Sequence, residues 1–165
     1  MQQFNYSDKG LALTKGFEGL HLTAYQDCAG IWTIGYGHTG PAVSAGQTIT
    51  EPEAEAFLRA DLADAIACVN HAVQLVITQN QFDALVDFCF NAGRGNFLQS
   101  TLLRKVNRGD FPGAAAQFAL WIHAGGDIVA GLVRRRKAEA AMFTAGAAAT
   151  YKLADCVTQA AYSEL

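Results

Sequence analysis

Gly30-Ile31-Trp32-Thr33-Ile34-Gly35-Tyr36-Gly37 alternates large apolar residues with small ones. That alternation, with β-branched and aromatic residues, is typical of a strand with one buried face. The segment just before it, residues 26–30, is rich in turn-forming residues, which indicates a hairpin. We therefore predict a small sheet within residues 21–47, with Asp27 and Thr33 on neighbouring parts of it.

Helices are predicted on both sides of this sheet. Ser7 or Asp8 can cap a helix that runs to about Glu18. Capping boxes at residues 50–53 and 78–81 open two more helices, the first to about Val69 and the second, very apolar and therefore central, to Ala92-Gly93. Further helices are expected over residues 99–108, 112–123, 132–145 and 151–162.

The whole chain is predicted to form one domain. It has 165 residues, of which 51% are hydrophobic and 16% charged, enough to bury a sizeable core. The predicted fold is α+β and mostly α. We expect an N-terminal lobe over about 10–50, a linking helix over about 51–69, and a larger helical lobe over about 70–165 that includes the N-terminal helix.

Charge and cysteine usage exclude several classes of protein. A net charge of -3 gives no reason to expect a nucleic-acid partner. The first nine residues lack the pattern of a secretion signal and no stretch could span a membrane, so we expect synthesis in a cytoplasm and no membrane insertion. Cys28, Cys68, Cys89 and Cys156 form no Cys-x-x-Cys pair, so we expect no metal site and no disulfide framework.

Glu18, Asp27 and Thr33 are the candidate catalytic residues. Glu18 ends a helix close to its packed side, where partial removal from water favours the protonated form that a general acid needs. Each residue also has an ordinary interpretation: a solvated helix end for Glu18, an Asx-turn for Asp27 and a strand threonine for Thr33. Their arrangement matters more, because cleavage of a glycosidic bond needs an acid on one side of the sugar and a carboxylate on the other.

Three motifs make the interpretation specific: Phe17-Glu18-Gly19, Tyr25-Gln26-Asp27 and Trp32-Thr33-Ile34-Gly35-Tyr36-Gly37-His38-Thr39. With them the chain resembles the bacteriophage lysozymes (endolysins) of glycoside hydrolase family 24, and the resemblance covers nearly all of its length. It implies a lysozyme-like fold of two lobes with a cleft between them. It also implies hydrolysis of the β-1,4 bond between N-acetylmuramic acid and N-acetylglucosamine in peptidoglycan, for host cell lysis.

The resemblance assigns a role to each catalytic candidate. Glu18 matches the general acid, Asp27 the second carboxylate, and Thr33 the threonine that helps to hold the attacking water. This implies an inverting mechanism, for which the two carboxyl groups should lie roughly 6.5 to 9.5 Å apart; a separation near 5 Å would favour a retaining route.

Other matching residues are expected to support the site. His38 is predicted to pair with Asp61, an acid beside the apolar stripe of its helix. Arg135 best matches the arginine beside the catalytic glutamate, although Arg134 or Arg136 remains an alternative. The remaining arginines are expected to face solvent or the peptide stems of peptidoglycan.

The resemblance also implies substrate contacts for Thr39, Phe90, Asn91 and Ser100. Two of these residues have other interpretations, because Phe90 could belong to the core and Ser100 could cap a helix.

Two alternatives to a hydrolase remain open: a lytic transglycosylase, which Asp27 and Thr33 disfavour, and a wall-binding or antimicrobial protein without catalysis. The resemblance implies no cofactor, a monomer, and storage in the host cytoplasm until lysis. A separate membrane pore, a holin, would then give access to the wall in the periplasm.

Overall fold

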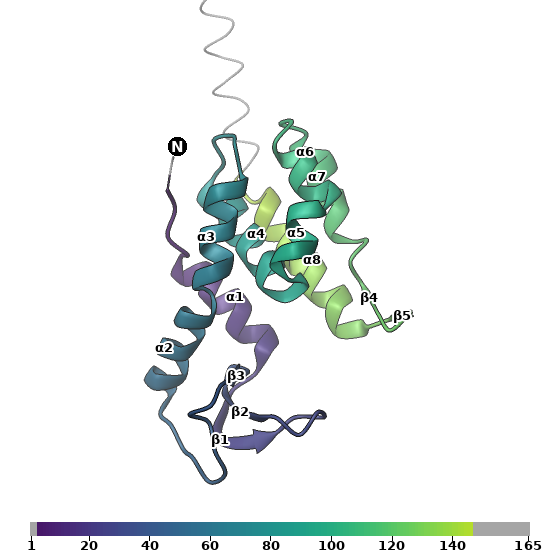
Figure 1. Cartoon of the computed structure of the whole chain (residues 1–165). Helices are drawn as coiled ribbons and strands as arrows, with labels where there is room; N and C mark the ends of the chain where they lie inside the picture. The colour runs from purple at the N-terminus through teal and green to yellow at the C-terminus, as the bar shows by residue number, and fades with distance from the viewer. Residues whose placement is uncertain (1–2, 147–165) are drawn as a thin grey trace, which may run out of the picture.

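The sheet has three antiparallel strands in the order β1-β2-β3: β1 (His21–Gln26), β2 (Trp32–Gly35) and β3 (His38–Thr39). It is part of a computed structural model that describes residues 3–146 (Figure 1). Thr33 lies opposite Tyr25 on one side and Thr39 on the other. The strand predicted over residues 30–37 is shorter than expected, because Gly35 and Gly37 have φ angles of 67° and 92° that turn the chain into β3.

The sheet has a small hydrophobic core of its own. Ala24, Ile34 and Val43 are buried there, and Trp32, Ile49 and Phe57 pack against them. Phe57 comes from the helix that follows the sheet, so this helix closes the buried face of the sheet.

Helix α1 (Asp8–Glu18) begins and ends at the predicted residues. Ser7 caps it by accepting a hydrogen bond from the backbone N–H of Gly10. Gly10 packs so closely on Tyr6 that an added Cβ would lie 2.5 Å from the ring. Gly19, with a φ of 73°, ends the helix and leaves Glu18 as its last residue.

The helix predicted over residues 51–69 is divided into α2 (Glu51–Asp61) and α3 (Ala63–Ala72). The capping box at Thr50 is present. The N–H of Leu62 is shared between the carbonyls of Leu58 and Ala60, which tightens the turn there. Because of this break, α2 packs on the sheet while α3 packs on the central helix.

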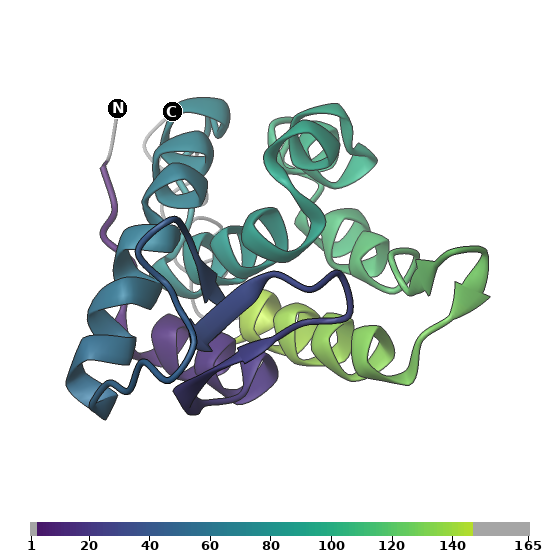
Figure 2. The same cartoon turned by 60° about the horizontal axis from the view of Figure 1, so that its bottom comes forward.

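Helix α4 (Gln79–Ala92) is the predicted central helix. All residues from Gln81 to Cys89 are buried, and α1, α3, α5 and α8 all contact it (Figure 2). Two of the buried residues, Asp83 and Asp87, are acids. Asp83 accepts hydrogen bonds from Ser7 and Gln79, so it ties the start of α1 to α4.

The remaining elements are α5 (Arg94–Gln99), α6 (Thr101–Val106), α7 (Phe111–Phe118), β4 (His123–Ala124), β5 (Asp127–Ile128) and α8 (Ala130–Thr144). The prediction missed α5, and the helix predicted over residues 112–123 ends at Phe118. A short hairpin follows, because Gly125 and Gly126 both adopt positive φ angles. The helix predicted over 151–162 lies outside the described residues.

Cys68 and Cys89 are buried free thiols, and Cys28 is exposed; Cys156 lies outside the described part of the chain. Burial raises the pKa of the Cys89 thiol to about 12, so it stays protonated. Within residues 3–146, no helix combines the length and hydropathy needed to cross a bilayer.

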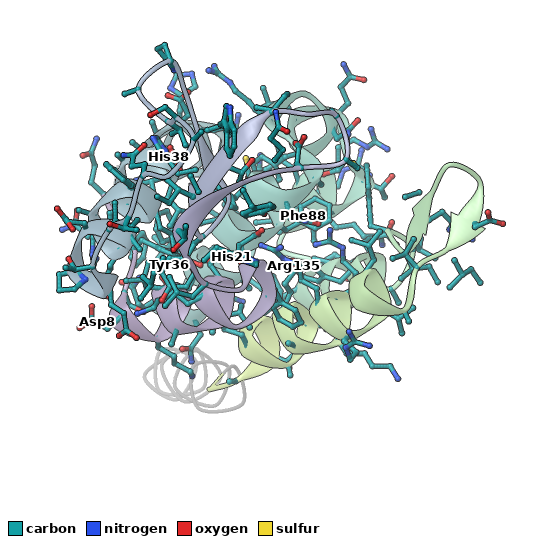
Figure 3. All side chains as sticks on the ribbon, turned by 90° about the horizontal axis from the view of Figure 1, so that it is seen from below. Asp8, His21, Tyr36, His38, Phe88 and Arg135 are labelled. Atoms are coloured by element: carbon teal, nitrogen blue, oxygen red, sulfur yellow. The ribbon has the colours of Figure 1, made fainter. Side chains whose placement is uncertain are left out.

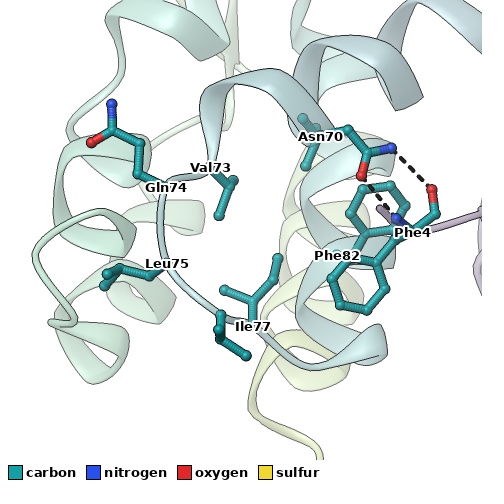
Figure 4. A pocket seen from close by; sticks show the side chains of 9 residues that line it. Phe4, Asn70, Val73, Gln74, Leu75, Ile77 and Phe82 are labelled. Atoms are coloured by element: carbon teal, nitrogen blue, oxygen red, sulfur yellow. Dashed lines mark hydrogen bonds between the residues drawn. The ribbon is translucent and has the colours of Figure 1, made fainter. Parts of the chain in front are cut away.

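An apolar crevice of about 80 Å³ lies under the α3–α4 connection (Figure 4). Phe4 stacks on Phe82 there, and the side chain of Asn70 exchanges two hydrogen bonds of 2.9 Å with the backbone of Phe4. The crevice therefore anchors the N-terminal segment, and none of the candidate catalytic residues lines it.

Phe118→Ala should lower the free energy of unfolding by about 3 to 5 kcal/mol, because Phe118 is fully buried and its ring packs against Phe88 and Phe143. Chemical denaturation measures the change. Leu120→Ala is the matched control: Leu120 is 65% exposed, and its loss should change stability by less than about 0.5 kcal/mol. Equal losses in the two variants would contradict this placement of the core.

Candidate active site

Glu18 lies at the C-terminal end of α1 with its side chain 24% exposed. The carbonyl end of a helix disfavours a carboxylate, so the charge needs a partner. Arg135 supplies it from α8, where its Nη1 donates a 2.6 Å hydrogen bond to Glu18 Oε1. Figure 3 shows Arg135 in the middle of the molecule, between α1 and α8. Of the three candidate arginines, Arg135 is the one that contacts Glu18.

Asp87 on α4 holds the other side of the Arg135 guanidinium. Arg135 Nε and Nη2 donate to the two oxygens of Asp87, both at 2.9 Å, and Asp87 has no exposed surface. Thr14 adds a 2.8 Å hydrogen bond to Asp87, and Tyr6 bonds in turn to Thr14. Burial alone would lower the pKa of Arg135, but the hydrogen bonds and charge of Asp87, with those of Glu18, raise it. Arg135 is therefore a fixed cation.

Arg136 corrects the expectation that the other arginines face solvent. Of the two arginines that flank Arg135, Arg134 is exposed but Arg136 is only 2% exposed. Its guanidinium lies over the Phe88 ring and donates to the Trp121 carbonyl, Glu139 and Asn91. Acceptors on α4, on α8 and after α7 thus draw Arg136 into the core.

Glu139 is a fully buried acid beside these arginines. Its Oε1 accepts from Arg136, while its Oε2 has no hydrogen-bond partner among the described residues. Burial raises the pKa of Glu139 to about 9, with Asp87 adding to the shift and Arg136 opposing it. Glu139 is therefore protonated near neutral pH.

Asp27 lies in the turn between β1 and β2 and is half-buried. Its Oδ1 accepts hydrogen bonds from the backbone N–H groups of Ala29 (2.8 Å) and Ile31 (2.9 Å), so the Asx-turn interpretation describes its local structure. Gly30, with a φ of 77°, closes the turn. Because Oδ1 is committed to the backbone, Oδ2 is the oxygen that can receive another donor.

Thr33 is 4% exposed on β2, and its Oγ1 donates to the carbonyl of Ile31 at 3.1 Å. The same carbonyl accepts the N–H of Asp27 at 3.0 Å. A single residue, Ile31, therefore holds both Asp27 and Thr33 through its backbone. With its proton donated, the Thr33 hydroxyl has lone pairs left to accept a hydrogen bond.

His38 on β3 lies against Asp61 at the end of α2, with Nδ1 3.0 Å from both carboxyl oxygens. The imidazole also stacks on Phe57, with ring centroids 4.5 Å apart. These contacts connect the sheet to α2.

The four candidate substrate residues differ in their exposure and in the hydrogen bonds that their side chains already make. Thr39 is exposed on β3, Phe90 is partly buried, and Asn91 is exposed, with its side-chain oxygen accepting from Arg136. Ser100 is 3% exposed and caps α6: its Oγ donates to the Phe97 carbonyl and accepts from the Leu103 N–H. The capping interpretation therefore describes the local structure of Ser100, and its contact with sugar stays a prediction.

The sequence alone assigned no role to Asp87 or Glu139, and it indicated Arg136 only as an alternative to Arg135. Asp87 could have been noticed because it is an acid among apolar residues of a helix, the same reason that singled out Asp61.

Across residues 3–146, no group of three or more His, Cys, Asp or Glu side chains could hold a metal ion.

The small sheet beside a helical lobe gives the chain the fold of the lysozyme-like class of proteins. The described fold is similar to that of a mutant of P22 lysozyme, with a TM-score of 0.80 and 38% identity over 88% of this chain and all of that one. It is also similar to the muramidase domain of SpmX from Asticaccaulis excentricus, with a TM-score of 0.79 and 43% identity over 86% of this chain and 98% of that one.

The sequence comparisons name the family. Residues 15–139 match the phage lysozyme family model. An endolysin of Acyrthosiphon pisum secondary endosymbiont phage 1 is 47% identical over 141 residues, which span 83% of this chain and 96% of that protein. The chain belongs to the phage lysozyme family.

Glu139→Gln should make the free energy of unfolding less sensitive to pH. The native-state pKa of Glu139, about 9, lies above the unfolded value of 4.5, so wild type loses stability as pH rises between these values. Relative to wild type, the variant should gain about 4 kcal/mol between about pH 5 and about pH 8, measured by urea denaturation, because one proton per molecule contributes about 1.4 kcal/mol per pH unit over this range.

Parallel stability curves for wild type and Glu139→Gln would contradict a protonated Glu139. Glu51→Gln, at an exposed position in the first turn of α2, is the control and should leave the shape of the curve unchanged.

Proposed function

We propose that this chain is a lysozyme that hydrolyses the β-1,4 bond between N-acetylmuramic acid and N-acetylglucosamine in bacterial peptidoglycan. The observation that carries the proposal is the pairing of Glu18 with Arg135 in a member of the phage lysozyme family, with Asp27 and Thr33 on the adjoining sheet. Relatives that are endolysins and a structural neighbour that is a muramidase support the same activity.

Glu18 is the proposed proton donor to the departing sugar oxygen. It is partly exposed, so substrate can reach it, and Arg135 fixes the orientation of its carboxyl group. The guanidinium also favours the ionised form, so stabilisation by Arg135 grows as Glu18 gives up its proton.

Asp27 and Thr33 are the proposed partners of the attacking water. Asp27 Oδ2 and the Thr33 hydroxyl can each accept a hydrogen bond from one water molecule, which leaves a lone pair on the water oxygen to attack the anomeric carbon. As the new C–O bond forms, the Asp27 carboxylate takes up one proton of the water. The Ile31 backbone holds both acceptors, so Asp27 and Thr33 are fixed relative to each other before substrate binds. Attack on the face opposite the departing sugar inverts the anomeric centre.

A lytic transglycosylase would need only an acid and would form an internal anhydro sugar. The backbone contacts that fix Asp27 and Thr33 have no use in that route, so they favour hydrolysis. A binding protein without catalysis would likewise leave the Glu18–Arg135 pair without a purpose.

Thr39, Phe90 and Asn91 are the proposed sugar contacts. Thr39 lies opposite Thr33 in the sheet register, and Asn91 follows Phe90 at the end of α4. Hydroxyl and amide groups beside an apolar surface suit a sugar, whose ring presents both polar and apolar faces.

His38, Asp61 and Arg135 are proposed to support the site structurally. We also propose one domain of two lobes that α2 and α3 connect, acting as a monomer. The endolysin relatives support a role in host lysis. In that role the enzyme would remain in the host cytoplasm until a holin admits it to the wall.

Glu18→Gln and Asp27→Asn should each reduce the rate of peptidoglycan clearing about a thousandfold. Both changes keep the observed hydrogen bonds, because an amide oxygen can still accept from Arg135 or from the Asx-turn N–H groups. Glu18→Gln therefore removes only the acidic proton, and Asp27→Asn removes only the negative charge. Turbidity of a purified peptidoglycan suspension measures the rate, and Asp64→Asn, at an exposed position on α3, serves as the control. Wild-type clearing by either site variant would refute its role.

The first product of cleavage should be a reducing end in the α configuration, as expected for inversion of a β bond. Proton NMR during the first minutes of digestion distinguishes the outcomes. A β-anomer would indicate a retaining route, and anhydromuramic ends would support the transglycosylase.

A further inference from the structure

The strongest feature without an assigned role is Asp87 on the buried side of Arg135. One guanidinium bridges two carboxyl groups of unlike environment: Asp87 is fully buried and takes two hydrogen bonds, whereas Glu18 is partly exposed and takes one. The bridge spans three helices, α4, α8 and α1. A change in the charge or the hydrogen bonds of Asp87 therefore alters the position and the effective charge of the guanidinium that contacts Glu18.

Two arginines of α8 lie beside Asp87. Arg135 pairs with both Asp87 and Glu18, whereas Arg136 pairs with Glu139. The other titratable groups that face Asp87 are Glu139 on α8 and Tyr6 before α1. Burial, then the charge of Asp87, raises the pKa of Tyr6, so it is neutral, and Glu139 is protonated as well.

We propose that Asp87 is a positioning residue that sets the pH range in which Glu18 keeps its proton. Asp87 acts through Arg135 in two ways: the two-point contact fixes the direction of Nη1, and the negative charge offsets part of the positive charge that Glu18 experiences. The inference rests on the proposed role of Glu18 as proton donor.

The direction of the effect follows from charge alone. Without the Asp87 charge, the guanidinium 2.6 Å from Glu18 would be opposed by Glu18 only. A less compensated cation favours the ionised carboxylate, so Glu18 would release its proton at lower pH. An acid catalyst that ionises early loses activity at the basic end of its range.

Asp87→Asn is the test, because it removes the charge and keeps the size of the side chain. The basic limb of the kcat–pH profile on purified peptidoglycan should move down by about one pH unit, with KM within about twofold of wild type. NMR of protein labelled with ¹³C-glutamate, assigned through Glu18→Gln, should show the same downward shift of the Glu18 titration.

Glu139→Gln is the matched control in the same cluster. It also replaces a buried carboxyl group by an amide, but the group it replaces is already neutral, so the Glu18 titration should stay within about 0.3 pH units of wild type. A merely structural role for Asp87 would lower stability without separating the two variants in their titration. Circular dichroism checks the fold of each, and Asp87→Ser replaces Asp87→Asn if the latter does not fold.

A folded Asp87 variant with the wild-type titration and basic limb would overturn the inference while leaving the proposed function intact. An active Glu18→Gln variant would instead refute Glu18 as the acid, and the NMR titration would still report whether Asp87 acts on Glu18.

Discussion

The two-point contact between Arg135 and Asp87 is the interaction on which the arrangement of the site depends. Both groups are almost completely removed from water, which is costly unless every hydrogen-bonding position is satisfied. Here Thr14 and Glu18 complete the set, so the cost is offset only when α1, α4 and α8 are all in place. Because Glu18 is bound to this buried cluster, its carboxyl group is held in place more firmly than a surface ion pair could hold it.

Local signals in the sequence were sufficient for most of the fold. Capping side chains marked the starts of α1, α2 and α4 within the described residues, and alternation located the sheet. The errors came where neighbours decide the backbone. The break at Leu62 lets two halves of one apolar stripe meet different partners, and the β4–β5 hairpin depends on two glycines that also fit a helix–helix linker.

The sequence identified the candidate catalytic residues but only some of the groups that support them. Glu18, Asp27 and Thr33 lie in short motifs, and the resemblance gave them roles. Their supporting groups come from distant segments: Arg135 lies 117 residues from Glu18 and 48 from Asp87. A buried acid can be noticed in a sequence, but its cation is defined only by packing. The same limit explains Arg136, which looks like a solvated residue until Phe88 and Glu139 are seen around it.

The Ile31 backbone gives Asp27 and Thr33 a structural support that is separate from that of Glu18. Asp27 and Thr33 are fixed within one tight loop, whereas Glu18 is fixed by the interior of the helical lobe. The short segment that begins at Gly19 joins α1 to the first strand, so the two halves are continuous in sequence but anchored independently. Substitutions inside the helical lobe can thus alter the surroundings of Glu18 without altering the loop that holds Asp27 and Thr33.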